Sequence, residues 1–222
     1  MLLAVDSSTQ RVGLALYDGS QVVGEMLWQS HNHHTVEIAP AIQSLLVRCG
    51  VKPQDLTALG VALGPGSFTS LRIGLAITKG MALALNLPLI GIPTLDALAV
   101  ALPVQDLPLA AVLQAGRNRL ALVWYAAQDG KWQAQGESKA TSVEELSQSI
   151  RKPTLVCGEL NAAERQILAR KRKNVILPTP AQSVRRPAML AELAWQRFQA
   201  GSVDEPISLA PIYLHVAGAI PA

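Results

Sequence analysis

The first half of the chain alternates short apolar runs with amphipathic stretches, a pattern that predicts strands and helices in turn. The predicted strands cover residues 2–5, 11–17, 21–28, 59–63 and 88–92, and the predicted helices cover residues 36–49, 70–85 and 94–102. Polar residues 7–10 and the pair Asp18-Gly19 separate the first three strands. These three strands are therefore expected to form consecutive hairpins.

The second half repeats this mixture of hairpin strands and helices. Strands are predicted at residues 109–114, 120–125, 131–135, 154–156 and 175–177, and helices at residues 142–150, 162–171 and 187–199. The segment 103–108, with a proline at each end, is the expected domain boundary. The chain is thus predicted to hold two successive α/β domains, residues 1–104 and 105–222, with the tail packing back on the first.

Two polar turns follow predicted strands of the first domain. One is the glycine loop Gly64-Pro65-Gly66-Ser67-Phe68-Thr69-Ser70, and the other is Asp6-Ser7-Ser8-Thr9. The N–H groups of a glycine loop and of a helix N-terminus can converge on a phosphate, and a carboxylate suits its metal ion. The alternative is that both are ordinary turns, which the same residue types favour.

The predicted helix at residues 70–85 is apolar almost all round. One face carries Leu71, Leu75, Thr78 and Ala82, another carries Ile73, Ile77, Met81 and Ala84, and the charged residues are Arg72 and Lys79. Such a helix must be buried on more than one side. A sheet covers one side, and either the protein's own helix 36–49 or a partner chain covers the other. We expect the isolated chain to form a homodimer through this face.

Composition narrows the class of protein. Half of the 222 residues are hydrophobic and 16% are charged, so the chain can bury a core. Much of the net charge of +3 comes from residues 170–173 and from Arg185-Arg186, which suit solvated helix ends or, alternatively, a contact with RNA. Arg72 and Lys79 interrupt the most apolar run, so no membrane span is expected and the protein is predicted to be cytoplasmic.

The sequence contains few cysteine and histidine residues that could bind a metal ion. Cys49 and Cys157 lie far apart in apolar surroundings, which fits reduced, buried thiols. The histidines stand at positions 31, 33, 34 and 215, and no two have the i, i+4 spacing of a helical ligand pair. No metal site is predicted.

Several motifs make the chain similar to the TsaB family, also called YeaZ. They are the opening Leu3-Ala4-Val5-Asp6-Ser7-Ser8-Thr9, the glycine loop with Leu71-Arg72-Ile73-Gly74 and Lys79-Gly80 behind it, Gln114-Ala115-Gly116-Arg117, and Pro211-Ile212-Tyr213-Leu214. The resemblance extends from end to end. Two departures stand out: Ser70 replaces the usual glycine, and the motif ending at Arg117 loosens an Asp-Ala-Arg sequence.

The resemblance implies a two-lobed actin-like, Hsp70-like ATPase fold of the ribonuclease H type. It also implies a non-catalytic subunit for the formation of N6-threonylcarbamoyladenosine at position 37 of tRNAs that read codons starting with adenine. Such a subunit scaffolds the catalytic paralogue TsaD as a heterodimer and helps to recruit the ATPase TsaE, and it meets tRNA indirectly through the complex. The chain would need no cofactor itself, while the complex uses ATP and Mg²⁺.

The resemblance also assigns roles to residues. The family interface is a helical bundle, so the partner interface is predicted to contain Ile38, Ile42, Leu45, Leu71, Leu75, Thr78 and Ala82. A nucleotide-binding framework inherited from the ATPase fold, vestigial or weak in this chain, is also predicted. Its residues are Asp6, Ser7, Ser8, Gly64, Gly66 and Ser67. No catalytic residue is assigned, and the H-x-x-x-H spacing of the paralogue's metal helix does not occur in this sequence.

Two other functions stay open. A stand-alone ATP-dependent phosphotransferase or glycopeptidase-like enzyme would use Asp6 for Mg²⁺ and the glycine loop for phosphates, although the sequence contains no Walker motif. An independent RNA-binding protein would rest on residues 170–173 and would bind tRNA by itself in a strongly salt-sensitive way.

Overall fold

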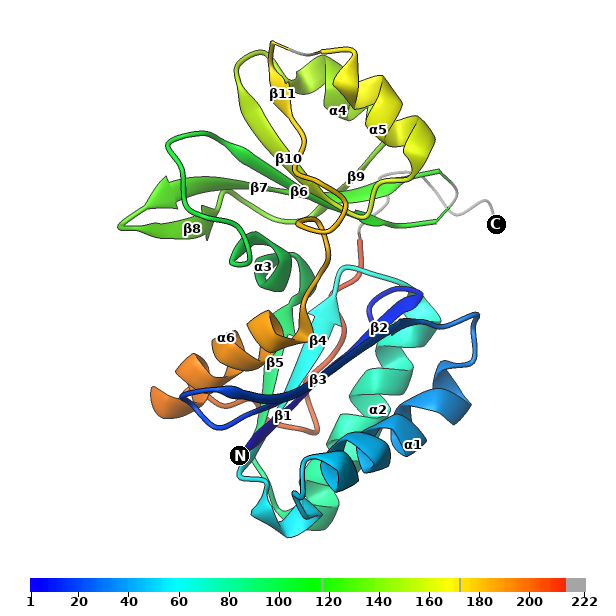
Figure 1. Ribbon diagram of the computed structural model, residues 1–222, viewed down its shortest axis with the longest axis vertical. Coiled ribbons are helices and arrows are strands. Elements are labelled where there is room, and N and C mark those ends of the chain that lie inside the picture. The colour runs from blue at the N-terminus through cyan, green and yellow to red at the C-terminus, as the bar shows by residue number, and fades with distance from the viewer. Residues whose placement is uncertain (117, 172, 215–222) are drawn as a thin grey trace. The chain divides into compact units, whose positions relative to one another are not determined.

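The computed structural model describes residues 1–116, 118–171 and 173–214 (Figure 1). The chain forms two compact units. The first unit holds residues 1–97 and 185–212, and the second holds residues 98–184 with Tyr213 and Leu214. Each unit has its own β-sheet. The motif residue Arg117 and His215 lie outside the described residues.

The first unit is built on a five-stranded sheet with the order β3-β2-β1-β4-β5. Its strands are β1 (Leu2–Asp6), β2 (Arg11–Tyr17), β3 (Val22–Gln29), β4 (Ala58–Gly64) and β5 (Leu89–Pro93). β1, β2 and β3 pair antiparallel, as the hairpin signals predict, whereas β4 joins β1 and β5 joins β4 in parallel. Because β1 and β4 are parallel neighbours, the turns that follow them emerge at the same edge of the sheet.

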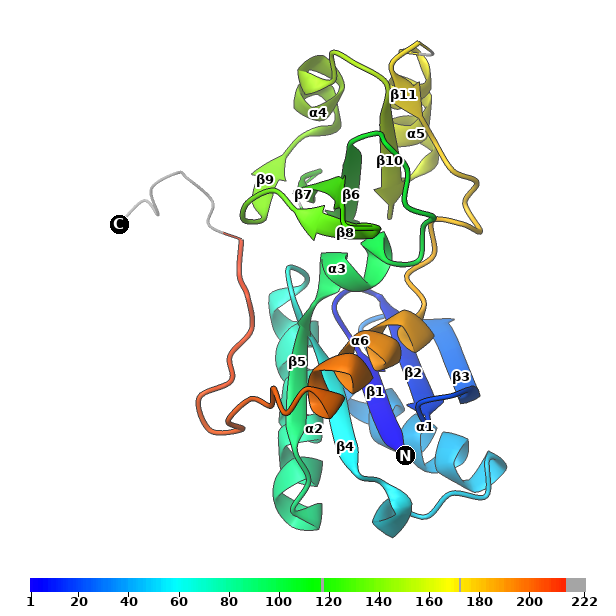
Figure 2. The same ribbon diagram turned by 90° about the vertical axis from the view of Figure 1, so that its left-hand side faces the viewer.

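Helices cover both faces of this sheet (Figure 2). α1 (His34–Arg48) and α2 (Phe68–Leu85) pack on the face that carries Leu3 and Val5, and α6 (Pro187–Gln199) packs on the face that carries Leu2 and Ala4. Successive side chains of a strand point to opposite faces. A strand covered on both faces has no polar side, which explains the wholly apolar start of the chain.

The position of α6 differs from the expected domain division. The sequence assigns residues 187–199 to the second domain, whereas α6 belongs to the first unit. Its apolar stripe of Leu190, Ala191 and Ala194 packs against the sheet face that α1 and α2 leave bare. The division between units therefore falls after residues 97 and 184, not after residue 104.

The second unit repeats the topology of the first. Its sheet has the order β11-β10-β6-β7-β8, with β9 also paired to β7. The strands are β6 (Leu109–Gln114), β7 (Leu120–Gln128), β8 (Lys131–Ala134), β9 (Lys139–Thr141), β10 (Thr154–Gly158) and β11 (Val175–Ile176). As in the first sheet, the chain begins with an antiparallel set, β6-β7-β8, and continues with strands parallel to its first member, β10 and β11.

Three further α-helices and a 3-10 turn occur among the described residues. α4 (Val143–Ser149) and α5 (Ala162–Ala169) cover one face of the second sheet, where Leu146 and Leu168 pack with Val112. α3 (Thr94–Ala99) leads from the first unit into the second, and the 3-10 turn η1 (Pro53–Asp55) precedes β4.

The long helix α2 bears on the expected absence of a membrane span. Within the described residues it is one helix whose length and composition alone would let it cross a membrane, in spite of Arg72 and Lys79. The core helix of a soluble protein can pass the same test. In this structure Leu71, Leu75 and Ala82 of α2 are buried in the first unit.

Candidate functional site

The two polar turns of the sequence lie together at one edge of the first sheet. Asp6, Ser7 and Ser8 follow β1, and the glycine loop follows β4. The backbone N–H of Ser67 donates to the carbonyl oxygen of Ser8 at 2.7 Å, so the two turns are in direct contact. The six framework residues predicted from the sequence are thus gathered at one place.

The glycines of this region allow close approach between chain segments. A Cβ atom at Gly66 would overlap the carbonyl oxygen of Ser8, and a Cβ atom at Gly74 would overlap the hydroxyl of Ser7. Gly64 has a φ of 111°, which side chains strongly disfavour. The carbonyl group of Ser8 therefore lies directly against the Cα atom of Gly66.

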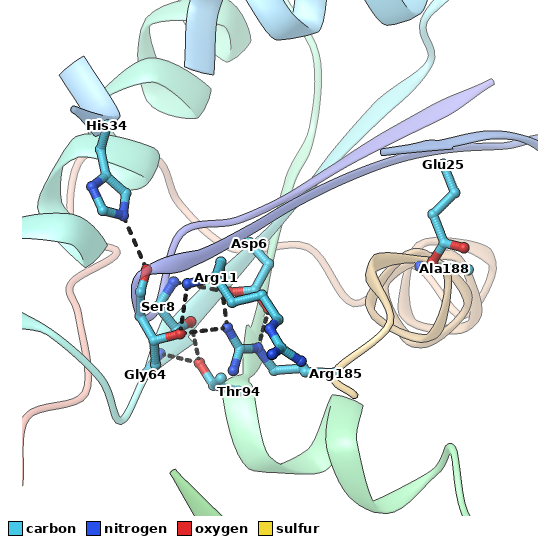
Figure 3. Close-up of polar contacts among 10 residues, drawn as sticks. Asp6, Ser8, Arg11, Glu25, His34, Gly64, Thr94, Arg185 and Ala188 are labelled. Atoms are coloured by element: carbon cyan, nitrogen blue, oxygen red, sulfur yellow. Dashed lines mark hydrogen bonds and ion pairs between the residues drawn. The ribbon is translucent and has the colours of Figure 1, made fainter. Parts of the chain in front are cut away.

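The hydroxyl groups of the two turns bond within the protein, and Figure 3 shows the contacts of Ser8 and Gly64 with Thr94. Ser8 Oγ lies 2.7 Å from Thr94 Oγ1, which also accepts from the backbone N–H of Gly64 at 2.9 Å. Ser7 Oγ donates to the carbonyl oxygen of Ser70 at 2.8 Å. The N-cap of α2 is Ser67, whose Oγ accepts from the Ser70 backbone N–H at 3.4 Å and from the Ser70 hydroxyl at 3.0 Å. The unusual Ser70 therefore adds to the cap.

The carboxylate of Asp6 forms a buried ion pair with Arg185. Both residues are 2% exposed, and Arg185 Nε donates to Asp6 Oδ2. The other carboxylate oxygen accepts from the backbone N–H of Ser8 at 2.9 Å. Arg185 Nη2 also donates to Thr9 Oγ1 at 3.2 Å and to the carbonyl oxygen of Arg11 at 3.1 Å (Figure 3). The guanidinium thus neutralises the acid that a nucleotide's metal ion would need.

Sequence reasoning missed Arg185, which it interpreted as part of a solvated or RNA-binding pair with Arg186. Only Arg186 fits that interpretation, since its side chain is 54% exposed and pairs with Glu25 at the surface. Arg185 lies 179 positions from Asp6, so no local pattern connects them. The one available signal is Pro187, which marks a helix start and places Arg185 in the turn before it.

The histidine cluster divides between surface and core. His31 and His33 are exposed, whereas His34 is buried and its Nε2 lies 3.0 Å from the carbonyl oxygen of Thr9. His34 thus supports the turn that holds Asp6. Within the described ranges, no group of three or more His, Cys, Asp or Glu side chains is placed to hold a metal ion.

The predicted interface residues are buried inside the first unit. The seven residues are Ile38, Ile42, Leu45, Leu71, Leu75, Thr78 and Ala82, and each is 6% exposed or less. Most of them form one core cluster with Leu3 and Val5 of β1. The assignment of these side chains to a partner contact is therefore corrected. The apolar pattern of α2 indicated burial, and its own sheet and α1 supply it.

A different set of side chains covers the outside of the two helices. Eight exposed small or apolar residues beyond the first residue of each helix are Val36, Ala39, Pro40 and Val47 on α1 and Ala76, Gly80, Leu83 and Ala84 on α2. We call these eight residues the outer helix face. Val36, Val47 and Leu83 are 68%, 73% and 70% exposed, which is unusual for side chains of this kind.

Two sheets of one topology, with polar turns at the ends of β1 and β4, define the actin-like ATPase class of α/β folds. Solved structures agree with this class. YeaZ from Pseudomonas aeruginosa matches 96% of this chain and 99% of its own with a TM-score of 0.78 and 23% identity. The ethanolamine utilization protein EutJ from Carboxydothermus hydrogenoformans matches 86% of this chain and 88% of its own with a TM-score of 0.52 and 16% identity.

Sequence comparisons identify the family within this class. The family model described as TsaD, tRNA N6-adenosine threonylcarbamoyltransferase, matches residues 28–212. The tRNA threonylcarbamoyladenosine biosynthesis protein TsaB of Bacillus subtilis is 30% identical over 227 residues, which cover 98% of this chain and 95% of that protein. The chain belongs to the TsaB family, whose relationship to TsaD accounts for the matching family model. The resemblance noted in the sequence and the fold that it implied are thereby confirmed.

Proposed function

We propose that this chain is the non-catalytic subunit required for N6-threonylcarbamoyladenosine formation at position 37 of tRNAs that read codons starting with adenine. In this role it scaffolds the catalytic subunit TsaD and helps to recruit TsaE. The name of its Bacillus subtilis relative supports the pathway, and the match to the TsaD family model supports a pairing of related chains.

The observation that carries the proposal is the buried ion pair of Asp6 and Arg185. In an actin-like ATPase of this topology, the acid after β1 is the group expected to meet the metal ion of a nucleotide. Here Arg185 Nε and the Ser8 backbone N–H occupy both carboxylate oxygens. Removing Arg185 from the acid would leave an unpaired buried charge, which is strongly unfavourable. The residues therefore do not fit Mg²⁺ with a nucleotide.

The glycine loop supports the same conclusion. Its Ser67 backbone N–H is bonded to Ser8, its Gly64 backbone N–H is bonded to Thr94, and the space beside Gly66 is closed by the Ser8 carbonyl. We infer that this chain requires no cofactor and that the ATP and Mg²⁺ of the reaction are used by other subunits. A stand-alone phosphotransferase or glycopeptidase-like enzyme would need Asp6 to bind Mg²⁺, and that carboxylate is already paired with Arg185.

The outer helix face is the surface that we assign to TsaD, and to a second copy of this chain when TsaD is absent. α1 and α2 lie side by side on one face of the first sheet (Figure 1), so their exposed sides form one apolar strip. A Cβ atom at Gly80 would meet nothing within 4 Å, so another helix can approach closely there. Apolar strips of this kind mark protein interfaces.

The test is tRNA modification with purified components. Threonine, bicarbonate, ATP, the threonylcarbamoyl-adenylate synthase, TsaD and TsaE are assayed with and without this chain, and the chain is also assayed without TsaD. We expect product only when this chain and TsaD are both present. Product formed without TsaD would make this chain a catalyst, and full activity without this chain would exclude the subunit role.

A further inference from the structure

One edge of the second sheet collects aromatic and basic side chains that the proposed function does not use. β6, β10 and β11 run parallel, so their first residues line up at this edge. β7 runs antiparallel to β6 and brings Tyr125 opposite Leu109, so its later residues reach the same edge. Figure 1 shows these strands side by side in the order β7, β6, β10 and β11.

An open cleft of about 470 Å³ lies at this edge. Its lining includes Pro108, Trp124, Gln135, Arg151, Lys152 and Thr154, and no acidic residue. Trp124 is half-buried and packs on the core of the unit with part of its surface, while Arg151 and Lys152 are exposed. The cleft thus combines an accessible aromatic side chain with positive charge.

Further cations continue from the cleft along the sheet edge. Thr154 of β10 pairs with Val175 of β11, so Lys152 and Lys173, each two residues earlier, precede neighbouring strands. The side chain of Asn174 donates to the carbonyl oxygen of Arg151 at 3.1 Å, which ties the two segments together. Lys171 lies in the same turn, since its carbonyl oxygen accepts from the backbone N–H of Asn174 and of Val175.

These cations are available to a ligand. In the described part of the chain, none of Arg151, Lys152, Lys171 and Lys173 has a carboxylate partner at ion-pair distance. From β7 to β11 there are three strand spacings, or roughly 14 Å. We call Trp124, Arg151, Lys152, Lys171 and Lys173 the aromatic–basic edge.

We propose that the aromatic–basic edge binds an unpaired stretch of RNA, with one base stacked on Trp124 in the cleft and the phosphates beside the cations. An aromatic platform beside a row of cations is the chemistry by which proteins hold single strands without reading their sequence. A duplex is excluded as the occupant, because its bases are stacked internally and cannot enter the cleft. The inference rests on the proposed function, which makes the RNA the tRNA substrate, and it gives this chain a direct contact with it.

The experiment measures binding of a fluorescein-labelled, single-stranded RNA oligonucleotide to the full-length chain over a series of salt concentrations. We expect weak binding, with a dissociation constant of roughly 10⁻⁴ to 10⁻⁶ M that rises with salt. Lys152→Glu with Lys173→Glu should reduce the slope of log K against log salt by about 1.4, because each phosphate contact of a single strand contributes about 0.7. The matched control is Lys52→Glu, an exposed residue of the first unit that does not belong to the aromatic–basic edge, which should change little.

Variants of Trp124 distinguish the contribution of base stacking to RNA binding from that of the cations. Trp124→Ala should weaken binding roughly 5- to 100-fold with the salt slope unchanged, and Trp124→Phe should recover part of the loss because it keeps an aromatic face. Thermal unfolding of each variant shows whether the unit is intact, since Trp124 also packs on the core. If Trp124→Ala unfolds, the Trp124→Phe and lysine variants still decide the question.

Several outcomes would overturn the proposal. They are no RNA binding at low salt, equal binding by all folded variants, or tighter Trp124-dependent binding of polyglutamate, which would make an acidic peptide the occupant. The reconstituted modification assay distinguishes this inference from the proposed function. If modification needs the chain but the chain does not bind RNA, only the RNA contact fails; if modification proceeds without the chain, the subunit role fails.

Discussion

The polar turns of the first unit and the aromatic–basic edge of the second unit differ in how far their polar groups are already bonded within the protein. The turns carry the residue types associated with nucleotide chemistry, but Asp6 is paired with Arg185 and the hydroxyls bond internally. The edge carries no recognised motif, but its cations are exposed or half-buried and lack acidic partners among the described residues. A motif shows which chemistry is possible, and the remaining bonding capacity of its atoms decides whether that chemistry is available.

The largest effect should come from breaking the ion pair of the closed turns. Arg185→Met leaves the Asp6 carboxylate buried without a partner, and the expected loss is about 3–5 kcal/mol in the free energy of unfolding. Arg186→Met, which breaks an exposed pair, should cost less than about 1 kcal/mol. Urea denaturation measures both.

A double variant sharpens the interpretation of this result. Asp6→Asn combined with Arg185→Met removes both charges, so it should regain part of the stability lost in Arg185→Met alone. A double variant as unstable as the sum of the two single variants would contradict a direct pairing.

A smaller loss is expected from filling the space beside the glycine loop. Gly66→Ala places a methyl group against the Ser8 carbonyl oxygen, and overpacking of this kind costs about 1–3 kcal/mol. Gly80→Ala is the matched control, because its methyl group points into open space on α2 and should stabilise the helix by about 0.5–1 kcal/mol. Equal unfolding midpoints for the two variants would show that the turns are not closed.

A substitution on the outer helix face should weaken association with a partner chain and leave the free energy of unfolding almost unchanged. Leu83→Glu changes a 70% exposed residue, so unfolding should shift by no more than about 0.5 kcal/mol while self-association and TsaD pairing are lost. Sedimentation velocity and co-purification with TsaD measure this. Gln166→Glu, an exposed polar position on α5 of the second unit, should leave pairing intact, whereas Leu75→Glu should unfold the first unit because Leu75 is core.

The smallest expected effect is on the pH dependence of stability, and it comes from the thiol of Cys157, which is buried in the second unit. Burial raises the pKa of its thiol to about 11, so the folded protein keeps this proton where the unfolded chain begins to lose it. The stabilisation is complete below the usual thiol pKa of about 9 and is lost as the pH rises through 11. Cys157→Ala should flatten the fall in stability over this window, measured by urea denaturation at fixed pH values.

Local pattern predicted most of the fold, because the first sheet is covered on both faces and its strands are plainly apolar. The succession of strands β1 to β8 along the chain and the approximate extent of α2 follow from the periodicity of apolar residues. β9 was missed because three residues are too few to show a period. The place of α6 was missed because an amphipathic stripe shows that a helix is buried but not which sheet buries it.

The candidate site was less predictable for the same reason. The sequence predicted that Asp6 and the glycine loop each follow a strand, and the parallel pairing of β1 and β4, which brings them to one edge, came from the structure. Arg185 joins them only through tertiary packing. The residues assigned to the partner interface were taken from the apolar stripes of α1 and α2, and these stripes face the protein's own sheet.

The return of α6 to the first sheet also sets the order in which the protein can mature on the ribosome. The sheet face carrying Leu2, Ala4 and Ile90 receives its cover only after residues 187–199 have been synthesised. At a translation rate of about 5–20 residues per second, the nascent first unit waits roughly 5–20 s with this face bare. Residues 98–184, which hold the sheet of the second unit and its helices α4 and α5, are all synthesised before α6, so the first sheet still lacks one cover when the second sheet has its helices.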